Sequence, residues 1–470
     1  MAYPYEQRSI LADPGAWQLG RYWQKSAQRT GDKLFYARNE PLFVIGRNRS
    51  GKDSGIGTYN ALQLHGKSLV YIDPRAETAA ITLPYRRTLG PVFCLNPFGL
   101  LTDIPGYGDL KSTNYNPLRF LNPSSPRFYE DCAAVAEALI QIEGKDPHWA
   151  KSARGLCLAF IMDEVKQALR ERRAPSLFRV RLAVTEPDIR DPKTRKLISG
   201  LAITIDRLVR EGGPQIASLI GRFGTDNEET QGVRAEADAQ TQWLISDAMA
   251  RELDDTHGGL DMRLLGDKPC TLYIILPSEM VSETHAIWLR LVISSAMRAL
   301  YRPRPDGVVC SFWLNEFRAL GVLRAVSDAM GLLAGYGIQP IPVLQSLSQM
   351  TIYDREWEKF LSDAGSIVHI GRCGEMFTAE YLSKMSGETS YREPTANTSF
   401  NPGGPPSVSI GEHYGRGPYL RPQDLMRIRD RFGFIWADGK VIPAYFPGYF
   451  DVDLLNDRGG RARRNPYFRG

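Results

Sequence analysis

Residues 41–55 read PLFVIGRNRSGKDSG, and this stretch decides the fold of the chain. A short apolar run ends at Gly46, and Gly51 and Lys52 follow after four further residues. The apolar run is typical of a buried strand, and a helix is expected from the lysine to about Leu64. The sequence therefore predicts a glycine-bounded loop between a buried strand and a helix.

A loop of this kind can bind phosphate. Its backbone N–H groups point inward, the helix N-terminus adds partial positive charge, and the Lys52 ammonium reaches the outer phosphates. Two glycines and a lysine are a weak signal alone, because average residue usage gives roughly 0.1–0.2 chance matches in a chain of this length. The motif also departs from the usual pattern, since Asp53 and then Ser54 stand where a Ser or Thr would bind Mg²⁺.

The composition is that of a globular protein large enough for several domains. The chain has 470 residues, of which 43% are hydrophobic and 24% are charged. The net charge of +5 permits an acidic partner such as nucleic acid but is too small to predict one. The cysteines form no C-x-x-C pair and the histidines no i, i+4 pair, which favours buried thiols over disulfides or a zinc site.

The sequence shows no targeting or membrane-spanning pattern. No stretch approaches the roughly 18 consecutive apolar residues of a membrane helix, and the N-terminus lacks the layout of a signal peptide. We therefore expect a cytoplasmic protein.

Strands and helices alternate on both sides of a long helical segment. After the glycine-bounded loop, strands are expected at residues 68–73 and 92–95, with a helix between them. The alternation resumes in later strands at residues 270–276, 308–314, 339–344 and 366–370. This order predicts an α/β fold with a mostly parallel sheet, whose ligands bind at the carboxyl ends of the strands.

The remaining segments complete the expected domain organisation. Trp17, Tyr22 and Trp23 lie at roughly helical spacing and predict a short helical lead. Residues 387–420 are rich in Ser, Thr, Gly and Pro and are expected to form a long loop, and residues 432–446 a β-hairpin. The expected parts are the helical lead (1–40), a first α/β part with the glycine-bounded loop (41–124), an all-α domain (125–261), a second α/β part (262–450) and a basic flexible tail (451–470).

Polar side chains follow two of the later strands. Asn315 and Glu316 end the strand 308–314, and Gln345 follows the strand 339–344. Phosphoryl transfer needs a Mg²⁺ ion near the outer phosphates and a group that activates water. In the usual motif an Asp precedes this Glu, so Asn315 departs from it. A neutral amide at Gln345 suits a sensor of the γ-phosphate, although many strands simply end in a polar turn.

With these residues in place, the sequence resembles the TraG-type coupling proteins of type IV secretion systems. These are hexameric RecA-like ATPases that deliver substrates to the secretion channel. The resemblance runs from Phe43 to Phe450. The matching motifs are RSGK at 49–52, IDPRAE at 72–77, LNPF at 95–98, YNPL at 115–118, LNEFRALG at 314–321, GYGI at 335–338, QSLSQ at 345–349, TAEYLS at 378–383 and RPQDL at 421–425.

The resemblance implies a RecA-like P-loop nucleotide-binding domain, interrupted by an all-α domain that engages substrate or adaptors. It implies ATP and Mg²⁺ as cofactors. Glu316 is expected to activate water, Gln345 to sense the γ-phosphate, and Arg372 is the candidate for an arginine that a neighbouring subunit contributes. The implied nucleotide-binding residues are Gly46, Arg49, Ser50, Gly51, Lys52, Asp53 and Ser54, and the implied metal-binding residues are Asp53, Asn315 and Asp73.

The resemblance also implies partners. They are other components of a type IV secretion system, with relaxase-bound single-stranded DNA, protein substrates or both as cargo. The active form is expected to be a homo-hexamer and the isolated chain a monomer. Members usually begin with transmembrane helices, which this sequence lacks, so we expect any docking at the inner membrane to occur through partners.

Asp53 and Asn315 lead to two hypotheses. In the first, Asp53 replaces the missing carboxylate near the metal, and the protein hydrolyses ATP to drive transfer. In the second, the extra carboxylate repels the phosphates by on the order of one to a few kcal/mol, and the protein is a non-hydrolysing substrate receptor or adaptor. A DNA helicase or packaging motor that works alone is a further class, which the mildly basic composition does not favour.

Overall fold

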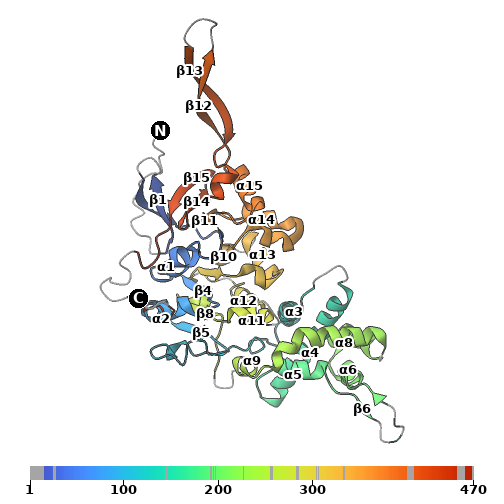
Figure 1. Ribbon diagram of the computed structural model, residues 1–470. Helices are drawn as coiled ribbons and strands as arrows, with labels where there is room; N and C mark the ends of the chain where they lie inside the picture. Colours follow the sequence, from blue (N-terminus) through green and yellow to red (C-terminus); the bar gives the residue numbers. More distant parts are fainter. Residues whose placement is uncertain are drawn as a thin grey trace. The chain divides into compact units, whose positions relative to one another are not determined.

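The computed structural model describes residues 15–24, 28–142, 147–190, 193, 195, 197–225, 227–254, 258–281, 285–302, 304, 306–331, 334–399, 407–451 and 461–467 (Figure 1). The chain forms two compact units. The first comprises Met1–Asn60 and Pro342–Asp453, and the second comprises Ala61–Ile341 and Leu454–Gly470. The segments expected to form one nucleotide-binding domain are thus shared between the two units.

The first unit is built on a mixed sheet around β3 (Leu42–Gly46). This strand lies between β10 (Ile338–Leu344) and β11 (Ser366–Ile370), and all three run parallel. Antiparallel strands extend the sheet beyond β11, in the order β14 (Phe432–Ala437), β15 (Lys440–Tyr445), β1 (Trp17–Gln24) and β2 (Arg29–Tyr36). Every residue of β3 is buried, which its uninterrupted apolar sequence requires of a central strand.

Helices and short helical turns connect these strands. The helix after β3 begins with a π turn, η2 (Asp53–Gly57), and ends with α1 (Thr58–Ala61), three residues earlier than expected. The others in this unit are η8 (Leu347–Glu356), α14 (Trp357–Ser362), α15 (Met376–Met385) and α16 (Pro422–Leu425). The predicted hairpin at residues 432–446 is confirmed, with Asp438 and Gly439 in the left-handed conformation that a two-residue turn requires.

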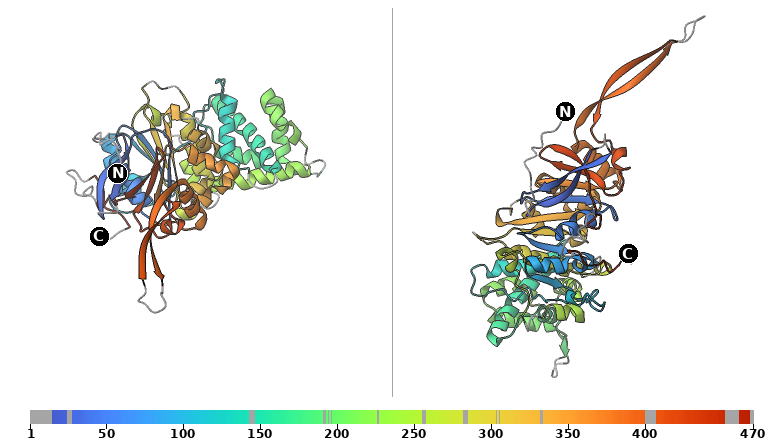
Figure 2. Two further views of the ribbon diagram at one scale, coloured as in Figure 1. Left: turned by 90° about the horizontal axis from the view of Figure 1, so that it is seen from above. Right: turned by 90° about the vertical axis from the view of Figure 1, so that its left-hand side faces the viewer.

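Two expectations about this unit are wrong. Residues 17–24 and 29–36 form the strands β1 and β2 instead of a helical lead, because Trp17 is fully buried and pairing at the sheet edge outweighs the helical spacing of the aromatic residues. Within the segment expected to be a long loop, the described residues form the paired strands β12 (Glu388–Ser399) and β13 (Ser407–Pro418). Figures 1 and 2 show this pair projecting from the rest of its unit.

The second unit has a parallel sheet of the order β9 (Cys310–Leu314), β4 (Ser68–Ile72), β8 (Thr271–Ile274) and β5 (Val92–Leu95). β4 is buried throughout. Helices and turns around the sheet are α2 (Glu77–Leu89), η3 (Gly108–Leu110), α10 (Leu264–Asp267), α11 (Ser278–Val281), α12 (Ala286–Ala299), η6 (Phe317–Leu320), α13 (Arg324–Gly331) and η7 (Ala334–Tyr336). The buried strands predicted at residues 68–73, 92–95, 270–276 and 308–314 are thus confirmed.

A helical segment lies between β5 and β8, as the periodicity predicts. Its elements are α3 (Phe128–Leu139), α4 (His148–Glu171), α5 (Leu177–Val184), α6 (Gly200–Glu211), α7 (Pro214–Ile220), η4 (Gly221–Phe223), α8 (Glu228–Thr241), η5 (Gln242–Ile245) and α9 (Asp247–Glu252). The long helix α4 packs against α3, α5, α7 and α8. The segment also holds a short antiparallel pair, β6 (Ile189–Arg190) and β7 (Leu197–Ile198), so it is not entirely helical.

Part of the segment expected to be a flexible tail is bound to the second unit. The Arg463 guanidinium donates to both oxygens of Asp109 at 3.0–3.1 Å, and its backbone N–H donates to the Ile81 carbonyl at 2.8 Å. The Tyr467 hydroxyl donates to the Arg75 carbonyl at 2.7 Å. Residues 461–467 therefore lie along α2 and the turn that precedes it.

These observations confirm an α/β fold with a mostly parallel arrangement of the central strands and a helical insertion. In the part of the chain that the structure describes, no helix combines the length and the apolar character that crossing a membrane requires. The six cysteines are buried free thiols, as expected.

Candidate functional site

The loop after β3 is shaped by the absence of a side chain at Gly46. A Cβ atom built on Gly46 would lie 2.6 Å from Ser50 Oγ and 3.1 Å from the Ile370 carbonyl oxygen. Ser50 is fully buried, and its hydroxyl has no hydrogen-bond partner among the described residues. The loop thus holds a buried polar group that a bound anion would satisfy.

The backbone of the loop also fits an anion. Arg49 and Gly51 have φ values of +65° and +100°, in the left-handed region that turns successive N–H groups towards one concave face. The Lys52 side chain is 6% exposed, so it lies against the loop and not in solvent. The helix that follows begins with the π turn η2, a form that is frequent at functional sites. These residues fit a phosphate group.

Asp53 is the first residue of this π turn and is half-buried. Ser54 follows it, and its hydroxyl lies 3.5 Å from the Gly51 carbonyl oxygen. Both side chains thus belong to the first turn of the helix that starts at the loop. A carboxylate here lies close to the phosphate-binding N–H groups, which makes Asp53 the unusual member of the loop.

Residues far along the chain hold the loop from its other side. The loop motif in the sequence does not predict these contacts. The Arg431 N–H donates to the Ser50 carbonyl at 3.0 Å, and the Tyr449 N–H donates to the Ser54 carbonyl at 3.0 Å. A Cβ on Gly371, whose φ is +76°, would lie 2.9 Å from Ser50 Cβ. Of these contacts, only the one at Gly371 has a signal in the sequence, because a glycine directly after a buried strand often marks a close approach of two segments.

Gln345 lies beside the loop because of the strand register. Leu344 of β10 pairs with Ile45 of β3, so Gln345 follows β10 at the level of Gly46. Its backbone N–H donates to Gln349 Oε1 at 2.9 Å. The sheet therefore brings this predicted site residue to the same edge as the loop.

Arg372 lies on the opposite side of β3, because Ile370 of β11 pairs with Gly46. It lines a cavity of about 570 Å³ together with Arg47 of the loop. The segment after α16 supplies the other lining residues, which are Met426, Arg427, Ile428, Arg429 and Asp430. The cavity is therefore rich in guanidinium groups, which suit a polyphosphate ligand. Sequence reasoning missed the basic run at 427–431.

A buried histidine lies beneath the loop. His369 is 1% exposed on β11, and burial lowers its pKa to about 4. Its Nε2 lies 3.2 Å from Cys373 Sγ, and burial together with the nearby Glu375 raises the pKa of that thiol to about 12. Both groups are therefore neutral at pH 7, and they do not form a reactive thiolate–imidazolium pair.

The second unit holds the other predicted site residues at the ends of two neighbouring strands. Tyr71 of β4 pairs with Trp313 of β9, so Asp73 and Asn315 each follow their strand at the same edge. Asn315 is 9% exposed, and Glu316 comes next with a left-handed φ of +53°. A non-glycine residue in this conformation carries backbone strain of order 1–3 kcal/mol, which is common at functional sites.

Asp73 has a structural role that is visible in the geometry. Its carboxylate oxygens accept the backbone N–H groups of Glu77 at 3.1 Å and of Ala79 at 2.8 Å, so it caps the N-terminus of α2. Among the described residues, no cluster of three His, Cys, Asp or Glu side chains could hold a metal ion by itself.

Comparison with known families gives one match over most of the chain. The model of a family described as Type IV secretory system Conjugative DNA transfer matches residues 5–456. The probable conjugal transfer protein TraG of Sinorhizobium fredii is 25% identical over 388 residues, and the protein VirD4 of Rhizobium radiobacter is 24% identical over 418 residues. The matched regions cover 80% and 87% of this chain, but 57% of each relative. The chain thus spans a little over half the length of these relatives.

Solved structures show the same fold. The bacterial conjugative coupling protein TrwBdeltaN70, in its unbound monoclinic form, has a TM-score of 0.63 at 15% identity, and the match covers 92% of this chain and 93% of that one. The plasmid coupling protein TrwB in complex with ADP and Mg²⁺ has a TM-score of 0.62 at 17% identity, with 96% and 97% covered.

Proposed function

We propose that this chain, which belongs to the type IV secretory system conjugative DNA transfer family, is a coupling-type P-loop ATPase. It recruits DNA or protein substrates to a type IV secretion machinery, and ATP hydrolysis drives their transfer. The observation that carries the proposal is the loop at residues 46–54, where the buried Ser50 hydroxyl, the left-handed backbone and Lys52 offer a ready site for phosphate.

ATP with Mg²⁺ is the proposed cofactor, and the related TrwB is known in complex with ADP and Mg²⁺. Lys52 binds the outer phosphates, and the loop N–H groups hold their oxygens. Mg²⁺ neutralises the charge that develops on the phosphates during transfer. Glu316 accepts a proton from the attacking water, and Gln345 orients that water against the γ-phosphate.

Asp53 is proposed to supply the carboxylate that Asn315 lacks. It is half-buried in the first turn after the loop, where a metal bound to the outer phosphates is within reach. Asn315 and Asp73 are the other proposed metal-side residues, as oxygen donors through bound water. Because Asp73 already accepts hydrogen bonds from two backbone N–H groups, we propose Asp53 as the main metal-binding carboxylate.

Arg372 is proposed to stabilise charge on the transferring phosphoryl group. It lines the arginine-rich cavity with Arg47, so it is well placed to act on a polyphosphate ligand. In a hexamer, which we propose as the active form, this arginine acts on the nucleotide bound by the neighbouring subunit. We further propose a cytoplasmic location, with attachment to the inner membrane through secretion-system partners.

Nucleotide binding and turnover test the proposal directly. Lys52→Ala should weaken binding of a fluorescent ATP analogue by at least tenfold, because the variant removes the charge that contacts the outer phosphates. Glu316→Gln should retain binding and reduce turnover by at least 100-fold, because it removes the proton acceptor. Lys359→Ala and Glu130→Gln, which replace exposed residues of the same types, are the matched controls.

The oligomeric state must be controlled in these assays, because an active site that needs a residue from a neighbouring subunit does not turn over ATP in a monomer. Turnover should therefore be measured over a range of protein concentrations, with and without single-stranded DNA. If wild-type turnover never exceeds that of both variants, the ATPase proposal fails. Retained nucleotide binding in that case would favour the receptor or adaptor function.

A further inference from the structure

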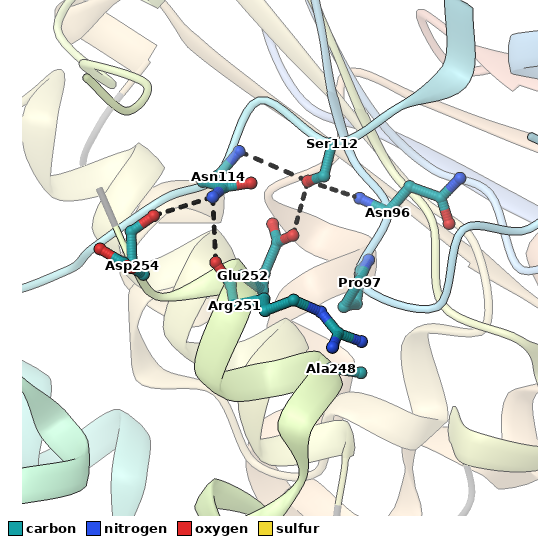
Figure 3. Close-up of a pocket in the computed structure, with 8 residues that line it drawn as sticks. All are labelled: Asn96, Pro97, Ser112, Asn114, Ala248, Arg251, Glu252 and Asp254. Carbon is teal, nitrogen blue, oxygen red and sulfur yellow. Dashed lines mark hydrogen bonds between the residues drawn. The ribbon is translucent and has the colours of Figure 1, made fainter. Parts of the chain in front are cut away.

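A second cavity lies in the second unit, where the connector after β5 meets the end of the helical segment. Its volume is about 320 Å³, which corresponds to about ten water molecules at the density of the liquid. The lining residues are Asn96, Pro97, Ser112, Asn114, Ala248, Arg251, Glu252 and Asp254 (Figure 3). Nothing in the proposed nucleotide chemistry uses these residues.

Glu252, the last residue of α9, is the unusual group in this lining. It is 1% exposed, yet it lines the cavity. The Ser112 hydroxyl donates to its Oε2 at 2.5 Å, whereas Oε1 is buried and no donor among the described residues reaches it. A buried carboxyl oxygen without a partner costs on the order of 1–3 kcal/mol. Because this carboxyl group borders a cavity, a small movement of its side chain would bring Oε1 within reach of a hydrogen-bond donor on a ligand once the group is ionised.

The surrounding backbone holds Glu252 in place. The Tyr115 N–H donates to the Glu252 carbonyl at 2.9 Å, and the Asn114 side chain donates to the carbonyls of Arg251 and Asp254 at 3.0 and 2.8 Å. The Ser112 oxygen in turn accepts the Asn96 N–H at 3.0 Å. The carboxyl group is thus pre-positioned, and a ligand would meet it without rearrangement of the backbone.

The charges around the cavity favour a cation once Glu252 is ionised. Burial raises the pKa of Glu252 to about 8, and the Ser112 hydrogen bond lowers it in part, so the carboxyl group is mostly protonated at pH 7. The other charged lining residues are Arg251 and Asp254, and Cys94 nearby is a neutral thiol because burial raises its pKa to about 12. When Glu252 ionises, the lining therefore carries one net negative charge.

We propose that this cavity binds a primary ammonium group, either the side chain of a lysine or the end of a free alkylamine. An ammonium is a compact charge with three donors, so one N–H can reach the single free oxygen of Glu252 while the others meet water or Asp254. A guanidinium group fits less well, because its planar fork pairs best with two carboxylate oxygens and Ser112 already occupies one of them.

Figure 3 is consistent with this assignment. The Glu252 carboxyl group turns towards Ser112 and Asn114, while the Arg251 side chain extends along the side of Pro97. The two side chains belong to consecutive helical residues, which do not face each other.

Binding exchanges a proton for the ligand, and calorimetry can detect this exchange. We would titrate the full chain with putrescine, and separately with N-acetyl-lysine amide, at pH 7.0 in two buffers of different ionisation enthalpy. The expected result is binding with release of about 0.9 proton per site, the fraction protonated at pH 7 when the pKa is about 8. Stronger binding of the amide would identify a lysine side chain as the source, and stronger binding of putrescine a free amine.

Variants distinguish binding at this cavity from non-specific binding of cations elsewhere on the protein. Glu252→Gln keeps the shape of the side chain but should weaken binding at least tenfold and abolish proton release. Asp254→Asn should keep the proton release and weaken binding only two- to threefold. Ala248→Trp, which fills the cavity without changing Glu252, should also block binding, and circular dichroism would verify that each variant is folded.

The proposal has clear ways to fail. Absence of binding by wild-type protein up to 50 mM of both amines would overturn it. So would equal affinity and equal proton release in wild-type protein and Glu252→Gln. N-acetyl-arginine amide serves as the chemical comparison, and tighter binding of this guanidinium compound than of both amines would also contradict the assignment.

Discussion

Each unit of the molecule holds a deeply buried side chain that a shifted pKa keeps neutral at pH 7, His369 in the first unit and Glu252 in the second, but the two neutral forms are opposite in protonation. His369, which pairs with Ile45 of the strand that leads into the glycine-bounded loop, has a pKa lowered to about 4 and has lost its proton. Glu252, at the wall of the second cavity, has a pKa raised to about 8 and has kept its proton. Burial disfavours the charged form in both cases. The two units should therefore respond to pH in opposite directions.

The surroundings of the two side chains differ. His369 Nε2 lies against the Cys373 thiol, and the residue packs within a sheet whose edge carries the loop. Each of the two side chains has one buried atom without a partner in the described part of the chain, Nδ1 of His369 and Oε1 of Glu252, but Glu252 also lines a cavity. A buried group inside a sheet serves packing, whereas one that borders a cavity is available to a ligand.

The largest expected effect is on the second unit. Glu252 has a folded pKa of about 8 against 4.5 for the ordinary group, so its contribution to stability is complete below pH 4.5 and is lost as the pH rises through about 8. The loss totals on the order of 5 kcal/mol. Glu252→Gln should remove this pH dependence. The stability of the variant relative to wild-type protein should therefore increase as the pH rises from 5 to 8.

Urea unfolding, followed by hydrogen exchange in peptides of each unit, measures this effect separately for the two units. Asp254→Asn is the control, because it changes an exposed carboxylate of the same cavity. If the stability of the second unit changes equally with pH in wild-type protein and Glu252→Gln, the carboxyl group is not the neutral acid described above.

The next effect has the opposite sign and belongs to the first unit. The ordinary pKa of His is 6.5 and that of folded His369 is about 4, so its stabilising contribution is present above pH 6.5 and is lost as the pH falls through about 4. The loss is on the order of 3 kcal/mol. His369→Gln should flatten this acid limb in the same exchange experiment, while His148→Gln, which alters a half-exposed histidine, should not.

A third prediction concerns the loop above His369. Gly46→Ala places a Cβ atom 2.6 Å from Ser50 Oγ, and the clash should destabilise the first unit by about 1–3 kcal/mol and weaken nucleotide binding at least tenfold. Gly374→Ala is the matched control, because no atom lies within 4 Å of the added methyl group. Equal melting temperatures and equal nucleotide affinities in the two variants would show that the loop tolerates the side chain.

The smallest effect returns to Glu252. Ser112→Ala removes the hydrogen bond to Oε2, which should cost the second unit about 1 kcal/mol. Because this bond lowers the pKa of Glu252, its loss should move the alkaline end of the pH dependence above pH 8. Ser218→Ala, which removes an exposed hydroxyl, is the comparison; an unchanged alkaline limit in Ser112→Ala would mean that Ser112 does not stabilise the carboxylate.

Local sequence patterns were enough to find most of the parallel strands and the loop. A continuous apolar run can be buried only as a central strand, so β3, β4 and β11 were predicted within one residue of their ends. Polar residues directly after such strands, like Gln345, were therefore predicted at the correct edge of the sheet.

The failures came where distant pairing overrides local preference. The strand β1 is extended because it pairs with β15, more than 400 residues away, and its aromatic spacing alone suggested a helix. The strands β12 and β13 contain many Ser, Thr and Gly residues, which usually form loops, yet they pair along their whole length. Neither pairing leaves a trace in the local composition.

The sequence by itself determined the glycine-bounded loop that we propose binds phosphate, and the parallel strands, because both depend on neighbouring residues and on the period of apolar side chains. The tertiary structure alone decided which side chains surround the loop and that the carboxyl group of Glu252 is buried. Arg431 reaches Ser50 and Ser112 reaches Glu252 across long stretches of chain. Burial and hydrogen bonding, which set these properties, exist only once those distant segments have packed together.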